Sequence, residues 1–353
     1  MTQSRKPPEA IDPLLFRFHL KTLRPLLEKW FKNKQVPQSI LLCGTSGIGK
    51  NDVARELAKW FLCEKISLTQ DLQDGFGFAD TASEFTPHPC GNCSVCHQIQ
   101  NDQALDFTSI GSADLSQSIK ILDLRSVLET QGRSAHGGKF RVFLLPNAER
   151  MTIQAANSIL KILEEPPRDW IFILTTTDPS LLLPTIVSRC HQCRLRPLPN
   201  DELKKMVDSP SLDHKKLQFA LKLSGGSLTR LKVFLSESQF QHIELIERFF
   251  ESPLKYYSEL VDWASSGGPQ ALLLVDGLEA FTHELLSETA KNHPIDNPAL
   301  KSHAKYAFRQ LGSQGAVVEF WMNQTERLNQ ARLELTKPIN RKLLIQDLVA
   351  SWI

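Results

Sequence analysis

Short apolar runs alternate with helical apolar spacing along the first 198 residues of the chain. Three runs of consecutive apolar side chains are typical of buried strands, and one further segment can hold a fourth. The predicted strands are 39–43, 140–145 and 170–175, with the fourth within 189–198. The predicted helices are 14–35, 52–63 and 155–165. Alternating strands and helices are typical of a parallel sheet covered on both faces, so this part is predicted to be an α/β domain ending near residue 197.

The pattern changes beyond residue 200. Apolar positions from 201 to 353 follow mostly helical spacing, and no convincing strand pattern occurs among them. Within the α/β part, the segment 64–89 is rich in Asp, Gly, Ser and Thr and is predicted to be an irregular insertion. A length of 353 residues is enough for two or three domains. We therefore expect an α/β domain followed by an all-helical part.

Composition adds little that is specific to any one function. Hydrophobic residues make up 41% and charged residues 23%, and 41 Lys and Arg against 39 Asp and Glu leave a net charge of +2. This net charge is too small to indicate a nucleic-acid partner, so any contact with DNA must come from a local patch of basic residues. No apolar run approaches the roughly 18 residues of a membrane span, and the polar start has no signal-peptide core. We expect a cytoplasmic protein with no membrane partner.

A glycine-rich loop follows the first predicted strand and precedes a helix. Residues 44–51 read G-T-S-G-I-G-K-N, which fits the phosphate-binding pattern G-x-x-x-x-G-K-[ST] except at its last position. The candidate nucleotide-binding residues are Gly44, Gly47, Gly49, Lys50 and Asn51. Backbone N–H groups of such a loop surround phosphate oxygens, and its lysine reaches the outer phosphates. A turn kept only for its fold is the alternative interpretation.

Two positions that handle metal in active P-loop ATPases are altered. Asn51 lacks the hydroxyl that normally binds Mg²⁺ after the lysine. The strand ending at residue 145 runs into Pro146 and Asn147, and the first carboxylate after it is Glu149. Because both changes affect the same chemical role, we predict that the loop does not support ATP hydrolysis, and we leave ATP binding open.

Three of the seven cysteines form the pattern C-x₂-C-x₂-C at Cys90, Cys93 and Cys96. With Cys63 they make a candidate tetrahedral zinc site, which would be structural because four thiolates leave no open position. His88 and His97 are alternatives to Cys63. An iron–sulfur centre uses similar spacing, but no further cysteine set accompanies it. Buried free thiols are the expectation for the remaining cysteines, which are Cys43, Cys190 and Cys193.

Several longer motifs carry a resemblance to a known family. Residues 155–167 read A-A-N-S-I-L-K-I-L-E-E-P-P, residues 188–190 read S-R-C, and residues 105–107 after the cysteines read L-D-F. Together with residues 338–348 they resemble the delta-prime family of bacterial DNA polymerase III clamp-loader subunits, within the AAA+ proteins. The altered residues Asn51, Pro146 and Asn147 favour the delta-prime type over the gamma/tau type.

The resemblance implies both an architecture and a role. It implies an AAA+ P-loop domain over 1–197 with a four-cysteine zinc module at 63–96, a helical lid over 198–240 and a helical, oligomerising collar over 241–353. The implied function is a clamp-loader subunit without ATPase turnover of its own, which inserts Arg189 as a trans arginine finger into a neighbouring gamma/tau subunit. The implied partners are the gamma/tau and delta subunits, the sliding clamp and, through the assembly, primed DNA. The alternative is a gamma/tau-type subunit that hydrolyses ATP itself.

Two further positions correspond to the sensor residues of the family. Thr176 and Thr177 lie where the family places its sensor-1 polar residue. Arg230 lies one residue later than the sensor-2 arginine of the family, so we assign it no nucleotide role.

Overall fold

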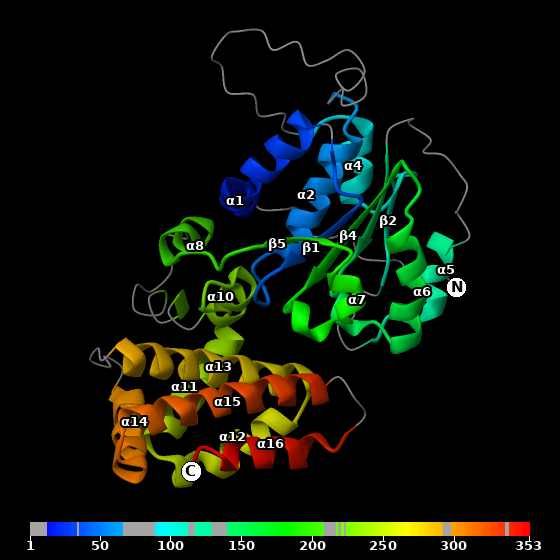
Figure 1. Ribbon diagram of the computed structural model, residues 1–353. Helices are drawn as coiled ribbons and strands as arrows, with labels where there is room; N and C mark the ends of the chain where they lie inside the picture. Colours follow the sequence, from blue (N-terminus) through cyan, green and yellow to red (C-terminus); the bar gives the residue numbers. More distant parts are fainter. Residues whose placement is uncertain are drawn as a thin grey trace. The chain divides into compact units, whose positions relative to one another are not determined.

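The computed structural model contains two compact units, Met1–Leu198 and Pro199–Ile353 (Figure 1). The first unit is α/β and the second is helical, which confirms the predicted fold class. The further division of the second unit into lid and collar stays a prediction. The structure describes residues 13–33, 35–65, 89–111, 117–128, 140–207, 217, 220–221, 224–291, 298–335 and 339–353.

The first unit is built on a five-stranded sheet with the strand order β2-β3-β4-β1-β5, in which all neighbours are parallel. The strands are β1 Ser39–Cys43, β2 Phe107–Ser109, β3 Arg141–Leu145, β4 Trp170–Thr176 and β5 His191–Arg194. The central strands β1, β3 and β4 are buried at every residue. This burial explains their continuous apolar sequences, because helices cover both faces of the sheet.

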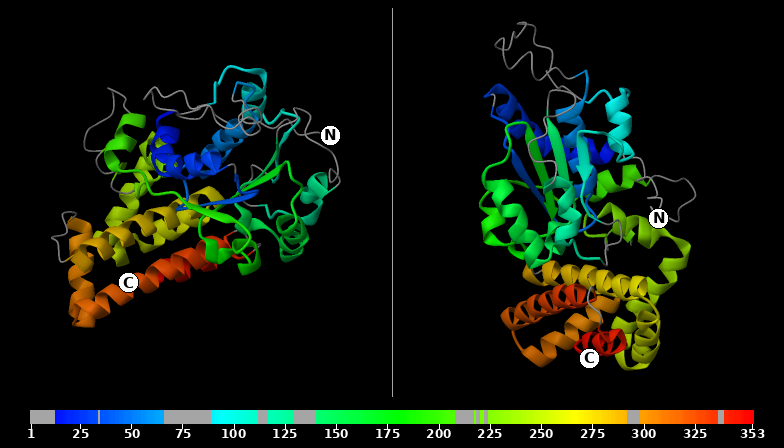
Figure 2. Two further views of the ribbon diagram at one scale, coloured as in Figure 1. Left: turned by 45° about the horizontal axis from the view of Figure 1, so that its top comes forward. Right: turned by 90° about the vertical axis from the view of Figure 1, so that its right-hand side faces the viewer.

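Two helical layers cover the sheet (Figures 1 and 2). On one face α2 packs across β1, β3 and β4, and α1 and α4 pack against α2. On the other face the core joins Leu41, Phe143 and Phe172 of the sheet to Ala155 and Ile159 of α6, beside α5 and α7. The helices are α1 Pro13–Lys32, α2 Lys50–Leu62, α4 Ser94–Gln100, α5 Ile121–Leu128, α6 Ile153–Glu164 and α7 Pro184–Val187.

The sequence predictions locate the central elements and miss a peripheral strand. β1, β3, β4 and β5 and helices α1, α2 and α6 all lie within or close to their predicted ranges. The edge strand β2 was not predicted, because it has only three residues and only Phe107 among them is buried. A strand this short carries too little hydrophobic pattern to be recognised.

The described residues of the second unit form helices and short connections without any strand, as predicted. Its helices are α8 Asn200–Met206, α10 Leu228–Leu235, α11 Glu237–Glu251, α12 Pro253–Ser265, α13 Gly268–Lys291, α14 Pro298–Leu311, α15 Gln314–Glu334 and α16 Arg341–Ala350. Aromatic side chains from several helices meet in its core, where Phe250 lies 5.0 Å from Phe281 and 5.2 Å from Trp352 between ring centroids. These long-range aromatic contacts hold α11, α13 and the end of the chain together.

Candidate functional site

The glycine-rich loop connects β1 to α2, as expected of a phosphate-binding loop. Gly47 and Gly49 adopt left-handed backbone angles, with φ of 76° and 85°. Lys50 is 6% exposed, and its Nζ donates hydrogen bonds to the carbonyl oxygens of Gly44 at 2.7 Å and Thr45 at 2.9 Å. Burial lowers the pKa of Lys50 to about 8, although the negative charge of a nearby carboxylate opposes the shift. A phosphate in this loop would compete with two backbone carbonyls for the lysine.

Helix α1 packs directly onto the glycine-rich loop. His19 is fully buried, and its Nε2 donates to the carbonyl oxygen of Ile48 at 2.8 Å. Burial lowers the pKa of His19, and the hydrogen bond to Ile48 opposes that shift. Gly49 faces Leu15 so closely that a Cβ there would lie 2.3 Å from Leu15 Cδ2. The last glycine of the loop is thus required both by its backbone angle and by the helix above it.

The two altered metal-handling positions are joined by a third residue, Thr175 in β4. Its hydroxyl donates to Asn51 Oδ1 at 2.7 Å and accepts from the backbone N–H of Asn147 at 2.8 Å. Thr175 has no solvent exposure. A neutral amide and hydroxyl network therefore occupies the positions where an active P-loop ATPase holds Mg²⁺ with a hydroxyl and carboxylates.

Thr175 was not singled out from the sequence. The available signal was a hydroxyl at the end of a strand that is otherwise apolar, because a buried hydroxyl needs hydrogen-bond partners. The sequence also could not reveal that its partners come from residues 51 and 147.

Glu149 is the first carboxylate that follows β3 along the chain. Its Oε1 accepts from the backbone N–H of Thr177 at 3.2 Å and from the hydroxyl of Thr177 at 3.1 Å. The hydroxyl of Thr176 instead donates to the carbonyl oxygen of Asp178 at 3.0 Å. Of the two threonines at the sensor-1 position, Thr177 is thus the one linked to a charged group of the loop that follows β3.

The four predicted zinc ligands come together in the structure. The ligand atoms of Cys63, Cys90, Cys93 and Cys96 all lie within 4.8 Å of one another. Cys63 directly follows α2, and Cys93 directly precedes α4, so the two packed helices fix both ends of the module. His97 is exposed and is not part of this group, and His88 lies outside the described residues.

The spacing of the thiols fits a tetrahedral metal. The Sγ atoms of Cys63 and Cys90 are 3.6 Å apart, and those of Cys63 and Cys93 are 4.0 Å apart. Four sulfurs at the usual zinc–sulfur bond length of about 2.3 Å would be separated by about 3.8 Å. Hydrogen bonds, first from the backbone of Asn92 and also from that of Cys93, lower the pKa of Cys90 to about 6. This set of donors suits a closed structural zinc site.

The other three cysteines have different surroundings. Cys43, Cys190 and Cys193 are buried and lie outside the four-cysteine group. Burial raises the pKa of Cys190 and of Cys193 to about 12. These two thiols are therefore protonated at neutral pH, and their distance from the four-cysteine group, not their pKa, keeps them out of the metal site.

Arg189 lies two residues after the end of α7, at the surface of the first unit. Its Nη1 donates to the carbonyl oxygen of Thr185 at 2.8 Å, and its Nη2 donates to Glu164 Oε1 at 2.5 Å. The side chains of Arg189 and Glu164 are 32% and 46% exposed. The predicted finger is thus accessible, and a carboxylate that the sequence analysis did not select contacts it.

Arg230 takes part in an ionic cluster within the second unit. Its Nη2 lies 2.5 Å from Glu279 and 3.3 Å from Asp276, and Arg332 contacts the same two carboxylates at 2.5 and 2.7 Å. Burial would lower the pKa of Arg332, but its two acidic partners together raise it. The cluster ties α10 to α13 and α15.

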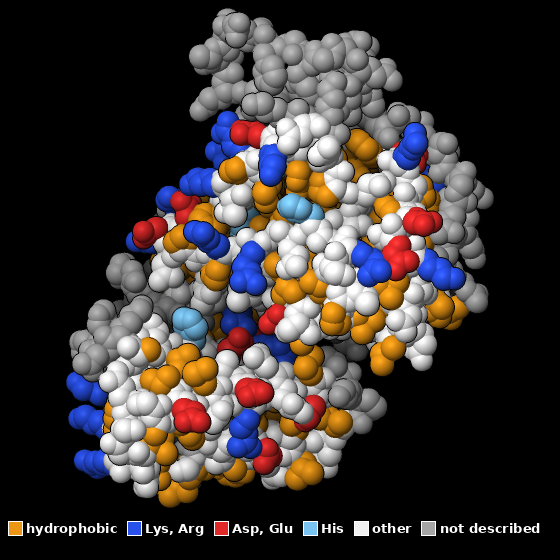
Figure 3. Space-filling view, in the orientation of Figure 1, with side chains coloured by type: hydrophobic (Ala, Val, Ile, Leu, Met, Phe, Trp, Pro, Cys, Tyr) orange, Lys and Arg blue, Asp and Glu red, His pale blue; other side chains and the backbone are white. Residues whose placement is uncertain are grey.

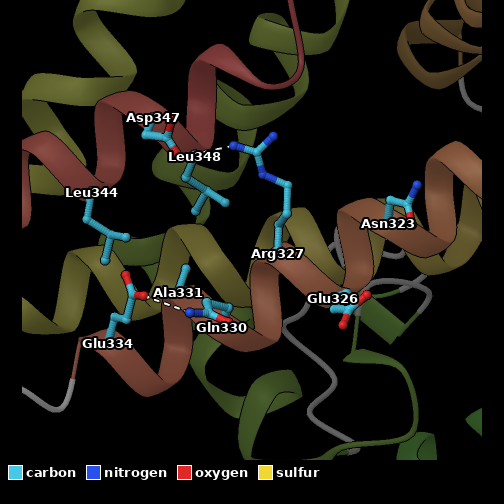
Figure 4. A pocket seen from close by; sticks show the side chains of 9 residues that line it. All are labelled: Asn323, Glu326, Arg327, Gln330, Ala331, Glu334, Leu344, Asp347 and Leu348. Atoms are coloured by element: carbon cyan, nitrogen blue, oxygen red, sulfur yellow. Dashed lines mark hydrogen bonds and ion pairs between the residues drawn. The ribbon is translucent and has the colours of Figure 1, made fainter.

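A cavity of about 390 Å³ lies between α15 and α16 (Figure 4). Arg327 and Asp347 form an ion pair of 3.0 Å at its wall, and their side chains are 48% and 74% exposed. Both charges therefore keep much of their hydration. The lining residues are Asn323, Glu326, Arg327, Gln330, Ala331, Glu334, Leu344, Asp347 and Leu348.

Surface charges are mostly mixed in sign on the face shown in Figure 3. Helix α14 is different, because it contains no acidic residue and exposes Lys301, Lys305 and Arg309 at intervals of four residues. This spacing places the three cations along one side of the helix. In the part of the chain that is described, no helix combines the length and hydropathy that crossing a bilayer requires.

Comparison with known proteins identifies relatives in DNA polymerase III. The chain is 27% identical over 329 residues to the delta' subunit of Pseudomonas aeruginosa, covering 90% of this chain and 92% of the relative. It is 31% identical over 174 residues to the tau subunit of Escherichia coli K12, covering 49% of this chain and 24% of the relative. The chain thus spans about a quarter of the tau subunits that it matches.

A solved structure and a family model also match the chain. A gamma subunit-related protein of Thermotoga maritima superimposes with a TM-score of 0.41 at 19% identity, over 94% of this chain and 97% of that chain. The model of the family described as DNA polymerase III, delta subunit, matches residues 20–199. Because this match covers just over half of its length, the chain belongs to the DNA polymerase III delta-subunit family.

Proposed function

We propose that the protein is a clamp-loader subunit of DNA polymerase III that does not hydrolyse ATP itself. The observation that carries this proposal is the network of Asn51, Thr175 and Asn147. Neutral amide and hydroxyl groups do not replace the carboxylates that hold Mg²⁺ and polarise the attacking water. The loop keeps the backbone shape of a phosphate site, so ATP binding without turnover is compatible with the proposal.

Arg189 supplies the catalytic contribution in this proposal. A guanidinium group that enters a neighbouring subunit's nucleotide site neutralises charge that develops on the transferred phosphoryl group, which accelerates GTPases by about 10³- to 10⁵-fold. The exposure of Arg189 and its place in the S-R-C sequence support this role. The neighbour would be a gamma/tau subunit carrying an active ATP site.

The remaining partners follow from the same proposal. The delta' relative aligns with 90% of this chain, which supports assembly with gamma/tau and delta subunits through the second unit. The assembly, more than this chain alone, would contact the sliding clamp and primed DNA. Zinc held by the four cysteines would stabilise the connection between α2 and α4 without taking part in chemistry.

Steady-state ATPase measurements on the purified chain and on the reconstituted loader test the proposal. We expect negligible turnover by the chain alone, and a lower clamp- and DNA-stimulated rate when Arg189→Ala is built into the loader. Size-exclusion chromatography checks that the variant still assembles. An unchanged rate in a fully assembled Arg189→Ala loader would remove the finger from the proposal.

The alternative is a gamma/tau-type subunit that hydrolyses ATP itself. Lys50, the glycine-rich loop and the similarity to tau subunits favour it. It predicts robust turnover by the isolated chain that Lys50→Ala abolishes, and that result would overturn the leading proposal.

A third possibility is a zinc-stabilised DNA-binding protein that works outside any loader. The cations Lys301, Lys305 and Arg309 on α14 would then be its contact surface. It predicts strong, salt-sensitive DNA binding by the chain alone, which glutamate substitutions at these three positions would abolish. We expect only weak binding.

A further inference from the structure

Arg189 is held between the C-terminal ends of two packed helices. Its Nη1 donates to the carbonyl oxygen of Thr185, in the last turn of α7, at 2.8 Å. Its Nη2 reaches Glu164, the last residue of α6, at 2.5 Å. The last carbonyls of a helix have no partner within the helix and carry partial negative charge. The guanidinium group therefore lies between the carbonyl oxygen of Thr185, which also accepts from Ser188 Oγ at 3.1 Å, and the carboxylate of Glu164 at the end of α6.

The carboxylate of Glu164 occupies an electrostatically unfavourable position of its own. A negative charge at the C-terminal end of a helix is repelled by the helix dipole, so Glu164 gains from a nearby cation. Arg189 forms an ion pair with it, and Lys161 is a second cation in the last turn of α6. The ion pair is thus electrostatically favourable for both residues. Because both side chains are partly exposed, neither charge depends on the other to compensate for burial.

The ion pair with Glu164 engages the same guanidinium group of Arg189 that would contact the nucleotide of the neighbouring subunit. A guanidinium group binds carboxylates and phosphates through the same planar N–H donors. While an Nη2 hydrogen is donated to Glu164, the positive charge is partly neutralised and the side chain is held against its own subunit. A phosphate on a neighbouring subunit would have to replace the carboxylate, or share the guanidinium with it.

We infer that Glu164 is a latch that holds Arg189 in cis and competes with the neighbouring subunit's nucleotide phosphates for it. This inference rests on the proposed role of Arg189 as a trans finger. Engagement of the finger then requires the exchange of a carboxylate for a phosphate. ATP hydrolysis in the neighbouring subunit is thereby coupled to breaking of the ion pair between Arg189, after α7, and Glu164 of α6.

The exposure of the pair sets the strength of the latch. Ion pairs between partly exposed side chains contribute little free energy, because water and salt screen them. Removing the carboxylate should therefore raise the Arg189-dependent part of the ATPase rate by about two- to fivefold, measured at ATP concentrations below KM. We define that part as the wild-type rate minus the rate of the Arg189→Ala loader.

The experiment compares loaders reconstituted with Glu164→Gln, Arg189→Ala and the double variant. Glu165→Gln is the matched control, because Glu165 is the adjacent, exposed residue of the same sequence and its carboxylate forms no ion pair or hydrogen bond among the described residues. All rates are measured with clamp and primed DNA from about 0.05 M to about 0.3 M salt, over which exposed ion pairs weaken strongly.

We expect the Glu164→Gln loader to be faster at low salt, with a ratio to wild type that approaches one as salt rises. We expect Glu164→Gln not to raise the ATPase rate in the Arg189→Ala background, because the guanidinium group that Glu164 would bind is absent there. A merely structural role of Glu164 would not produce this salt-dependent, Arg189-dependent gain.

Two outcomes separate the failure of the latch from the failure of the finger. If Arg189→Ala lowers the rate while Glu164→Gln behaves like Glu165→Gln, or lowers the rate as well, the finger stands and the latch is refuted. If Arg189→Ala leaves the rate of an assembled loader unchanged, the proposed finger fails and the latch fails with it.

Discussion

Protonation of His303 should destabilise the second unit of the protein in mildly acidic solution. His303 lies on α14, is 5% exposed and is surrounded by aromatic rings, with centroid distances of 5.1 Å to Phe250, 5.6 Å to Trp321 and 5.9 Å to Trp352. Burial lowers its pKa from 6.5 to about 4. Charging the imidazole within this cluster is therefore costly.

The sign and size of the effect follow from proton linkage. Because the pKa is lower in the folded state, the unfolded chain takes up the proton first, so stability is fully present above pH 6.5 and is lost as the pH falls toward 4. The complete loss corresponds to about 3 kcal/mol. Between pH 7.5 and pH 5 the expected share is about 2 kcal/mol in the free energy of unfolding.

Urea unfolding followed by tryptophan fluorescence, repeated across this pH range, measures the effect. The replacement His303→Phe removes the titration and keeps an aromatic ring in the cluster. We expect the difference in unfolding free energy between wild type and His303→Phe to move by about 2 kcal/mol between pH 7.5 and pH 5. His283→Gln, at an exposed position on α13, is the control and should follow the wild type. If that difference between wild type and His303→Phe does not change with pH, the burial argument is wrong.

Three further predictions concern the loop, the metal and the ionic cluster. Gly49→Ala should lower the free energy of unfolding in urea by about 1–3 kcal/mol, because the new Cβ strains the backbone and contacts Leu15. Gly91→Ala, with open space around its Cβ, should lower it less. Equal losses for the two variants would contradict the packing argument. Wild-type protein should contain about one zinc ion per chain and Cys93→Ser much less, with a lower melting temperature, and undiminished zinc would exclude Cys93 as a ligand. Arg332→Met should cost about 2 kcal/mol, because it leaves partly buried carboxylates short of a cation, and a neutral result would show that the cluster is dispensable.

Much of the first unit is predictable because its signals are local. The central strands are continuous apolar runs, and the loop from Gly44 to Lys50 carries its glycines where the backbone turns left-handed. The C-x₂-C-x₂-C spacing likewise predicts that three thiols converge. These patterns depend on neighbouring residues, so they are visible without the fold.

Other features escape prediction because their partners are distant in sequence. The hydroxyl of Thr175 is 124 residues from Asn51, and its role as a hydrogen-bond centre appears only when β4 is placed beside β1. Glu164 is 25 residues from Arg189, and one glutamate of the E-E-P-P sequence looks like the other until α6 and α7 are packed together.

The sequence by itself determined the α/β-then-helical organisation, the altered P-loop and the cysteine pattern, because periodicity, backbone conformation and ligand spacing are short-range properties. Only the tertiary structure brought Cys63 and not His97 to the other three thiols, turned Lys50 onto the carbonyls of its own loop, and set Glu164 against Arg189. Those outcomes depend on which side chains the packing of helices against the sheet brings within a few ångströms. The physical reason is that hydrogen bonds and ion pairs act over such short distances, and the fold alone decides which distant residues meet.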